Sequence, residues 1–224
     1  MTETGWINYI VAFAVFFASH MVLVRPPVRP ILVRALTPAG FSICYSVLSL
    51  AILWWLIVAA RDAPFVEIWA WAPWQNWVPR IAMIPFCVIL AFGVGVPNPF
   101  SFGGMRNDRF DPAKPGLVKW IRHPVLAGLL VWSAAHLVPN GNLAHVILFG
   151  AFAVFSLLGM KMIDKRRQRE MGPDWLRLVQ AMKQVQNVHD VDWQNLLTRA
   201  LLAAVAYFVL AGLHPYLIGI DPFA

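Results

Sequence analysis

Charged residues are scarce in this sequence. They make up 13% of its 224 residues, whereas 59% are hydrophobic and eleven are tryptophan. Soluble globular proteins carry about 25% charged residues, so this deficit excludes an ordinary soluble domain. The apolar residues gather in runs of about 20, the length at which a helix crosses the hydrocarbon core of a bilayer. The sequence therefore predicts an all-α, polytopic integral membrane helical bundle that occupies residues 1–224 as one domain.

Cysteine is also rare, since Cys44 and Cys87 are the only two in the sequence. They stand in separate apolar runs and lack the CxxC spacing of metal or redox sites. We therefore expect both to be small packing residues rather than a disulfide or a metal pair. The first residues contain no lysine or arginine and no small-residue cleavage site, so a cleaved signal peptide is not expected.

Acidic residues are fewer than basic ones, eleven against eighteen, which gives a net charge of +7. In a soluble protein such an excess would suggest nucleic-acid binding. Here the lysine and arginine residues flank the apolar runs, a pattern that sets membrane topology and contacts lipid headgroups. We expect a lipid bilayer, and no nucleic acid, as the partner of these charges.

Six apolar runs are long enough to be transmembrane helices. Clusters of proline and glycine, such as RPPVRP (25–30) and VPNPFSFGG (96–104), interrupt the chain between them. We expect about six spans, at roughly 6–24, 39–60, 80–96, 124–140, 143–161 and 198–218, with a long cytoplasmic connection at 162–197.

The distribution of lysine and arginine tests this number of spans. Sixteen of the eighteen lie in or beside the first, third and fifth connections, and only Arg61 and Arg80 lie on the other side. Positively charged connections stay in the cytoplasm. The sequence therefore predicts six spans with both termini on the non-cytoplasmic side.

The fifth connection contains an amphipathic segment. In KRRQREMGPDWLRLVQAMKQVQ (165–186), a Gly-Pro break precedes a helix that carries Trp175, Leu176, Leu178, Val179 and Met182 along one side. An interfacial helix on anionic lipid explains this pattern, and a docking site for a protein partner explains it as well. His189, later in the same connection, is expected to be solvated.

No aspartate, glutamate, lysine or arginine lies in the interior of an expected span. Ion-coupled transporters place such groups at depth, so a secondary transporter is not expected. Three histidines remain of interest: His20 in the first span, and His123 and His136 at the two ends of the fourth. Neutral imidazole is the usual protein ligand of haem iron, and paired membrane histidines indicate b-type haem. A histidine in a span also serves as a helix–helix hydrogen-bonding residue.

The stretch HPVLAGLLVWSAAHLVPNGNLAHVILFG (123–150) resembles the central signature of the NnrU family, in which a His-Pro opening leads to Trp, Ala-His-Leu, Asn-Gly and Leu-Phe-Gly. The first expected span and the arginine-rich connection after it are similar to the family's, as is the run YSVLSL (45–50). The resemblance covers residues from about 7 to about 170. His145 stands where the family more often has a small polar residue, so we assign it no shared role.

This resemblance implies a haem-binding membrane protein. NnrU proteins take their name from gene neighbourhoods for nitrite and nitric oxide reduction. The related 15-cis-zeta-carotene isomerase is a membrane enzyme said to hold haem b through two histidines. Carried onto this sequence, these metal ligands are His20 and His136. The resemblance thus implies either a role in nitrogen-oxide, denitrification-linked metabolism or a redox-gated isomerase of a lipid-soluble polyene, in a bacterial inner membrane.

Depth in the membrane favours a second pairing of cofactor-binding residues. His20 lies about five residues from the cytoplasmic end of its span, roughly 6–8 Å deep, whereas His136 lies roughly 20 Å beyond the cytoplasmic start of its own. His123 is closer to His20 in depth. His20 with His136 remains the first expectation, and His20 with His123 is its geometric rival.

The string Arg122-His123-Pro124 also resembles membrane methyltransferases that use Arg-His-Pro near an S-adenosylmethionine site. The paired glutamates usual in those enzymes are replaced here by KMIDKRRQRE (161–170), in which Asp164 and Glu170 do not form such a pair. A helix start explains the string equally well, because proline is favoured at the first helical position and cations at the membrane boundary.

Three functions are therefore open. The first is a haem-b membrane protein, either an isomerase or a redox protein. The second is a non-enzymatic accessory or assembly factor that docks on a membrane redox complex. The third is a methyltransferase of the Arg-His-Pro type. No residue is assigned a catalytic role.

Overall fold

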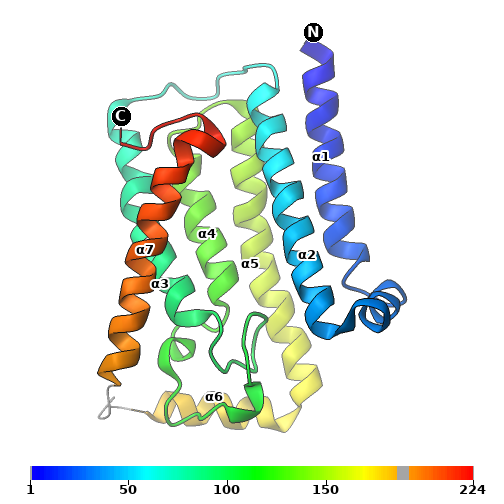
Figure 1. Ribbon diagram of the computed structural model, residues 1–224, viewed down its shortest axis with the longest axis vertical. Helices are drawn as coiled ribbons and strands as arrows, with labels where there is room; N and C mark the ends of the chain where they lie inside the picture. Colours follow the sequence, from blue (N-terminus) through cyan, green and yellow to red (C-terminus); the bar gives the residue numbers. More distant parts are fainter. Residues whose placement is uncertain (1, 186–191, 224) are drawn as a thin grey trace. The chain divides into compact units, whose positions relative to one another are not determined.

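The computed structural model describes residues 2–185 and 192–223, so His189 lies outside the described residues. The expected all-α class is confirmed, because the described residues form helices and no strand (Figure 1). Three short 3-10 helices, η1 (Pro73–Asn76), η2 (Asn107–Arg109) and η3 (Gly116–Lys119), lie in the connections. The α-helices are α1 (Thr2–Val22), α2 (Val28–Asp62), α3 (Trp77–Gly93), α4 (Pro124–Leu137), α5 (Leu143–Met171), α6 (Pro173–Gln184) and α7 (Trp193–Ile218).

Six of these helices are apolar membrane elements. Helices α1, α2, α5 and α7, and α3 together with η1, are long and apolar enough to cross a bilayer, and α4 is a shorter apolar helix. Large apolar side chains such as Ile43, Leu201 and Phe208 are about two-thirds exposed on them. Such surfaces are stable in lipid and not in water. The chain is therefore an integral membrane protein with about six membrane helices.

Helix α2 begins earlier than the sequence predicted and is broken near its start. Thr37 has φ 64° and ψ 162°, outside the helical region. Pro38 follows it, and proline disfavours helical geometry in the residue before it. The segment 28–36 is therefore a short helix, and in Figure 1 it is turned away from the axis of the rest of α2.

Helix α5 continues ten residues past the expected end at 161, to Met171. The extension is rich in lysine, arginine and glutamate, which are strong helix formers. Glu170 pairs with Arg166 at 2.6 Å and with Arg167 at 3.0 Å, one helical turn away. Gly172, with φ 56°, ends the helix directly before Pro173.

The chain divides into two compact units. Unit 1 contains Met1–Trp69 and Asn142–Leu148, and thus α1, α2 and the first residues of α5. Unit 2 contains Ala70–Gly141 and Phe149–Ala224, and thus the other helices and most of α5. The expectation that residues 1–224 form a single domain stays a prediction.

In unit 1, polar side chains join the helices at a few points. The Tyr9 hydroxyl of α1 donates to the carbonyl of Ala144 at 2.6 Å, and Trp55 Nε1 of α2 donates to Asn8 Oδ1 at 3.2 Å. Helices α1 and α2 also pack directly against each other, and Ala12 of α1 is completely buried.

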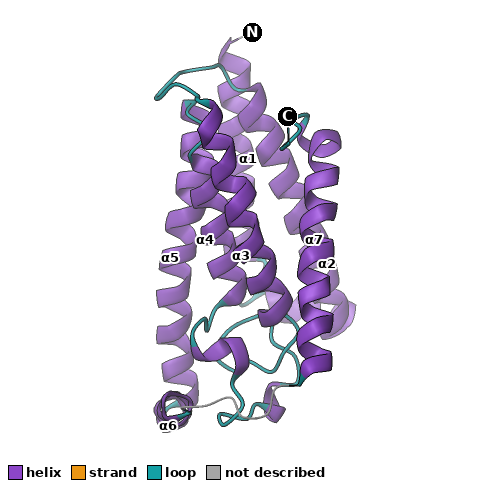
Figure 2. Cartoon of the chain, turned by 90° about the vertical axis from the view of Figure 1, so that its left-hand side faces the viewer, coloured by secondary structure: helices purple, strands orange, loops and turns teal. Residues whose placement is uncertain are grey.

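In unit 2, α3 packs against both α4 and α7, and α7 runs beside α3 in both views (Figures 1 and 2). The contact of α3 with α4 is close: a Cβ atom built on Gly93 would lie 2.2 Å from Cβ of Pro124. At the other end of α3, the Tyr207 hydroxyl of α7 donates to the carbonyl of Arg80 at 3.2 Å.

The connection between α3 and α4 packs against α6 within unit 2 (Figure 2). Phe100 and Val118 of this connection form a buried cluster with Val179 and Met182 of α6. The apolar side of α6, interpreted from the sequence as a surface for lipid or a partner, is therefore covered largely by the chain's own residues.

Candidate functional site

His20 lies in unit 1, on α1, with one ring nitrogen engaged. Its Nδ1 atom is 2.8 Å from the backbone carbonyl of Phe16, four residues earlier. A carbonyl only accepts hydrogen bonds, so Nδ1 carries the proton and Nε2 keeps its lone pair. The ring stacks on Phe16 with a centroid distance of 4.1 Å, and Tyr45 of α2 meets it edge-on at 5.6 Å. The described residues provide no hydrogen bond to Nε2.

His136 lies in unit 2, near the end of α4, in the same arrangement. Its Nδ1 atom donates to the carbonyl of Trp132, four residues earlier, at 2.8 Å. The rings of Trp132 and Phe149 lie 5.3 Å and 5.6 Å from it, centroid to centroid. Within the described part of the chain, Nε2 of His136 also has no hydrogen-bond partner.

The two histidines thus present the same tautomer. A backbone carbonyl that accepts from Nδ1–H fixes the ring orientation and leaves Nε2 as a neutral nitrogen donor, as in metal-binding histidines. Aromatic rings flank both imidazoles. No cluster of three or more His, Cys, Asp or Glu residues suited to a metal ion occurs among the described residues. The donor chemistry therefore suits an iron porphyrin, which needs one or two protein nitrogens.

His20 and His136 belong to different units, so their pairing across one cofactor stays a prediction. His214, on α7 in unit 2, donates from Nδ1 to the carbonyl of Ile220 at 2.6 Å. His145, in unit 1, has its Nδ1 atom 2.9 Å from Asn142 Oδ1.

His123, the third predicted ligand, is placed differently. Both of its ring nitrogens are engaged: Nδ1 lies 3.0 Å from the Ser101 hydroxyl, and Nε2 lies 3.0 Å from Asp164 Oδ1. The residue is 4% exposed. Iron ligation by His123 would require one of these two hydrogen bonds to break. Because His20 belongs to the other unit, the His20–His123 pair also stays a prediction.

Asp164 of α5 is the centre of this polar network. Its carboxylate accepts hydrogen bonds from Arg122, through Nη2 at 2.7 Å and through Nε at 3.3 Å. It also accepts one from Nε2 of His123. Because the carboxylate only accepts, Nε2 of His123 carries the proton, and the Ser101 hydroxyl donates to Nδ1. Burial lowers the pKa of His123 below its usual value, against the opposing charge of Asp164. The imidazole is thus held neutral at pH 7.

Asn98 extends the network into the connection between α3 and α4. It is completely buried, its Nδ2 donates to the carbonyl of Arg122 at 2.9 Å, and its Oδ1 accepts from the backbone of Phe100 at 3.1 Å. The backbone N–H of Asn98 in turn donates to Asn107 Oδ1 at 2.9 Å. These bonds fasten the connection to the start of α4. The network therefore stabilises unit 2 by holding the α3–α4 connection against the start of α4.

Ser101, Asn98 and the role of Asp164 could not be recognised from the sequence, in which Asp164 is an acid without a second carboxylate beside it. Two local features mark members of the network without showing that they meet: an asparagine between two prolines in the string VPNPF, and a single aspartate among basic residues at the end of an apolar run.

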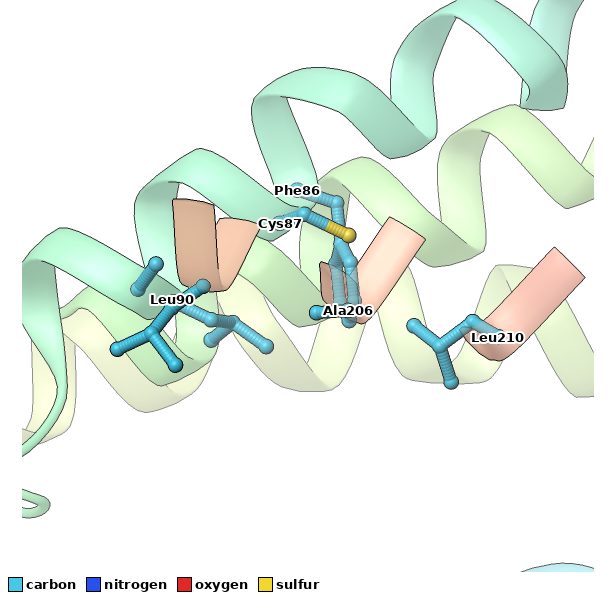
Figure 3. Close-up of a pocket in the computed structure, with 7 residues that line it drawn as sticks. Phe86, Cys87, Leu90, Ala206 and Leu210 are labelled. Carbon is cyan, nitrogen blue, oxygen red and sulfur yellow. The ribbon is translucent and has the colours of Figure 1, made fainter. Parts of the chain in front are cut away.

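An apolar groove between α3 and α7, of about 310 Å³, is a separate feature of unit 2 (Figure 3). Small side chains at Cys87, Ala91 and Ala206 leave the space, and no histidine lines it. Its other lining residues are Phe86, Leu90, Leu202 and Leu210. The groove is therefore not part of either histidine environment.

Comparison with known families identifies one match. The family described as NnrU protein matches residues 8–222, nearly the whole chain. Comparisons with curated proteins and with solved structures gave no match. The match extends past the stretch on which the sequence resemblance depended, through α6 and α7. The chain belongs to the NnrU family.

Proposed function

We propose that this protein binds haem b in the membrane, and that His20 and His136 would each supply an imidazole nitrogen to hold it. The observation that carries the proposal is the arrangement that both histidines share: each imidazole donates Nδ1–H to the carbonyl four residues earlier, keeps Nε2 for a ligand, and lies between aromatic rings. Bound haem would supply an iron centre able to change its oxidation state. This chemistry serves either a redox role in nitrogen-oxide metabolism or the isomerisation of a lipid-soluble polyene.

The chain's own residues orient the two imidazoles and keep water away from them. The carbonyls of Phe16 and Trp132 fix the two rings. The rings of Phe16, Tyr45, Trp132 and Phe149 form apolar walls beside them. Apolar surroundings favour the neutral form of an imidazole over the charged form. The lone pair of Nε2 therefore stays available to a metal.

The contacts of Arg122 and His123 favour haem ligation over methyl transfer. A methyltransferase site at Arg122-His123-Pro124 would need the arginine and the histidine to face a cofactor. Both side chains instead bind Asp164, and His123 also binds Ser101.

The test is the visible absorption spectrum of protein purified in detergent from haem-replete cells. We expect a Soret band in the wild type and its loss, or a large reduction with a shift, in His20→Ala and His136→Ala. His145→Ala and His214→Ala are the matched controls, because each removes a histidine whose Nδ1 is also hydrogen-bonded. A wild-type protein without a Soret band would refute haem binding.

We further propose that the basic connections of this protein face the cytoplasm of a bacterial cell and that the chain crosses the inner membrane. Sixteen of the eighteen lysine and arginine residues support this orientation. Both termini then lie on the opposite side, since six membrane helices separate them.

A further inference from the structure

The short helix 28–36 at the start of α2 carries charge of one sign only. Arg29 and Arg34 lie in it and Arg25 precedes it, and all three are exposed. The sequence contains no acidic residue between Glu3 and Asp62. None of the three arginines forms an ion pair in the described part of the chain. Arg29 lies over the Phe41 ring at 5.8 Å, a contact that leaves its hydrogen-bond donors available.

The same helix has an apolar side. At 100° per residue, Val28, Ile31, Leu32, Ala35 and Leu36 fall within an arc of about 140°, and Arg29 and Arg34 fall outside it, with Val33 between them. This side is not covered: Ile31 is 63% exposed and Leu36 is 40% exposed. A helix with one exposed apolar side and one exposed cationic side is stable at a membrane surface, where acyl chains cover the first and anionic headgroups bind the second.

The break at Thr37 separates the axis of the helix 28–36 from the axis of the rest of α2. Because Thr37 is outside the helical region, 28–36 does not continue the long axis of α2. In Figure 1 it lies at the end of unit 1, turned across that axis. A helix in this position lies at the membrane surface when the rest of α2 crosses the membrane.

We infer that the helix 28–36, with Arg25, is a binding element for anionic phospholipid: its apolar side enters the acyl region and its arginines bind headgroup phosphates. Charge complementarity selects this occupant, since three unpaired cations stand beside an apolar surface with no acid among them. An acidic protein partner would satisfy the arginines and would leave Ile31 and Leu36 in water. The inference does not depend on haem binding.

Binding of labelled phosphatidylglycerol to the purified full-length protein, against labelled phosphatidylcholine, tests this inference. The variant combines Arg25→Gln, Arg29→Gln and Arg34→Gln. Each arginine near an anionic surface is worth roughly fivefold in affinity, so we expect phosphatidylglycerol binding to weaken at least about tenfold and phosphatidylcholine binding to stay unchanged. The matched control combines Lys165→Gln, Arg166→Gln and Arg169→Gln, which removes the same charge from exposed positions of α5.

An equal loss in both variants would assign the effect to net charge and overturn the inference. A helical circular dichroism spectrum equal to that of the wild type checks that each variant is folded. A variant that fails this check is replaced by the single substitutions, of which at least one must reproduce the selective loss.

A second measurement locates the helix directly. Spin labels at Ala35→Cys and at Pro30→Cys, on a background of Cys44→Ser and Cys87→Ala, sample the apolar side and the arginine side. In phosphatidylglycerol bilayers we expect the first label to be accessible to oxygen and the second to a water-soluble nickel complex. Two labels accessible only to the nickel complex, or two shielded from both reagents, would contradict a membrane-surface position.

Discussion

At the scale of single residues, the three candidate ligand histidines differ in which ring nitrogens are engaged. His20 and His136 use one nitrogen in a hydrogen bond to a backbone carbonyl of their own helix. His123 uses both, with Ser101 and Asp164. A buried polar group left without a partner costs about 1–3 kcal/mol. The second nitrogen of His20 or His136 therefore has reason to find a ligand, whereas His123 is already satisfied.

Replacement of Asp164 by asparagine is expected to destabilise unit 2. The Asp164→Asn side chain keeps the shape but loses the charge that Arg122 and His123 bind. Because the pair is partly exposed, we expect a loss of about 1–3 kcal/mol, seen as a lower midpoint of thermal unfolding in detergent. The control is Asp174→Asn, whose partner Arg177 is mostly exposed, and there the loss should stay below about 1 kcal/mol. Equal losses would show that the network adds nothing to stability.

The stability of the protein should fall on acidification because of His123. Its pKa is lowered in the folded protein by burial, so the unfolded chain takes up the proton first, beginning near pH 6.5. The contribution of His123 is complete above that pH and is lost as the pH falls toward the lower, folded pKa. We expect the unfolding midpoint to drop more between pH 7.5 and pH 5.5 in the wild type than in His123→Gln. A smaller drop in the wild type would mean that Asp164 stabilises the charged imidazole more than burial disfavours it.

His20 and His136 could be singled out from the sequence as candidate ligands, and their ligation stays a prediction, whereas the polar network could not be predicted. His20 and His136 stand out because each is a lone polar group in an apolar run. The network of Asp164, Arg122 and Ser101 joins residues far apart in the chain, and no local pattern records such a contact. Asp164 also lies beyond the predicted end of its span. An aspartate among basic residues at a membrane surface is expected there without any particular hydrogen-bond partner.

At the scale of helices, the crossing of α3 and α4 depends on the absence of a side chain. Gly93 is the last residue of α3 and faces Pro124, the first residue of α4. The rigid proline ring cannot move aside as a flexible side chain could. The two helix ends approach closely for that reason, and the connection between them is fastened there by Asn98.

Gly93→Ala should therefore destabilise the protein. Its new methyl group would lie 2.2 Å from Cβ of Pro124, and such overpacking costs about 1–3 kcal/mol. Gly150→Ala in α5 is the matched control, since its added Cβ meets no atom within 4 Å. Alanine is a better helix former than glycine by about 0.5–1 kcal/mol, so this control should be neutral or stabilising. Thermal unfolding of both variants in the same detergent is the measurement, and a neutral Gly93→Ala would contradict the close contact.

Sequence periodicity predicted which segments are helical better than it predicted where they end. The apolar runs placed a helix in each of the six expected segments. The early start of α2 was missed because RPPVRP is rich in proline, although proline is tolerated in the first turn of a helix. The extension of α5 was missed because an apolar run indicates only the part of a helix that lies in the membrane, and not where the helix itself ends. Charged residues such as Arg166 and Glu170 continue the helix outside the apolar run.

At the scale of the whole molecule, the arrangement of basic residues and the helix order together support the proposed orientation. The basic residues stand at the α1–α2 connection, at the α3–α4 connection, and from the end of α5 to the start of α7. The α2–α3 and α4–α5 connections carry almost none. Alternation over successive connections is expected when each of six helices crosses the membrane once.

Labelling of single cysteines tests this orientation in living cells. On a background of Cys44→Ala and Cys87→Ala, the positions are Thr4, Ala70 and Ala113, which are all exposed. We expect a membrane-impermeant maleimide to label Thr4→Cys and Ala70→Cys in intact bacterial spheroplasts, because the N-terminus and the α2–α3 connection lie outside. Ala113→Cys, in the basic α3–α4 connection, should react only after permeabilisation. The reverse pattern would place the basic connections outside and contradict the proposed topology, since lysine and arginine resist transfer across the bilayer.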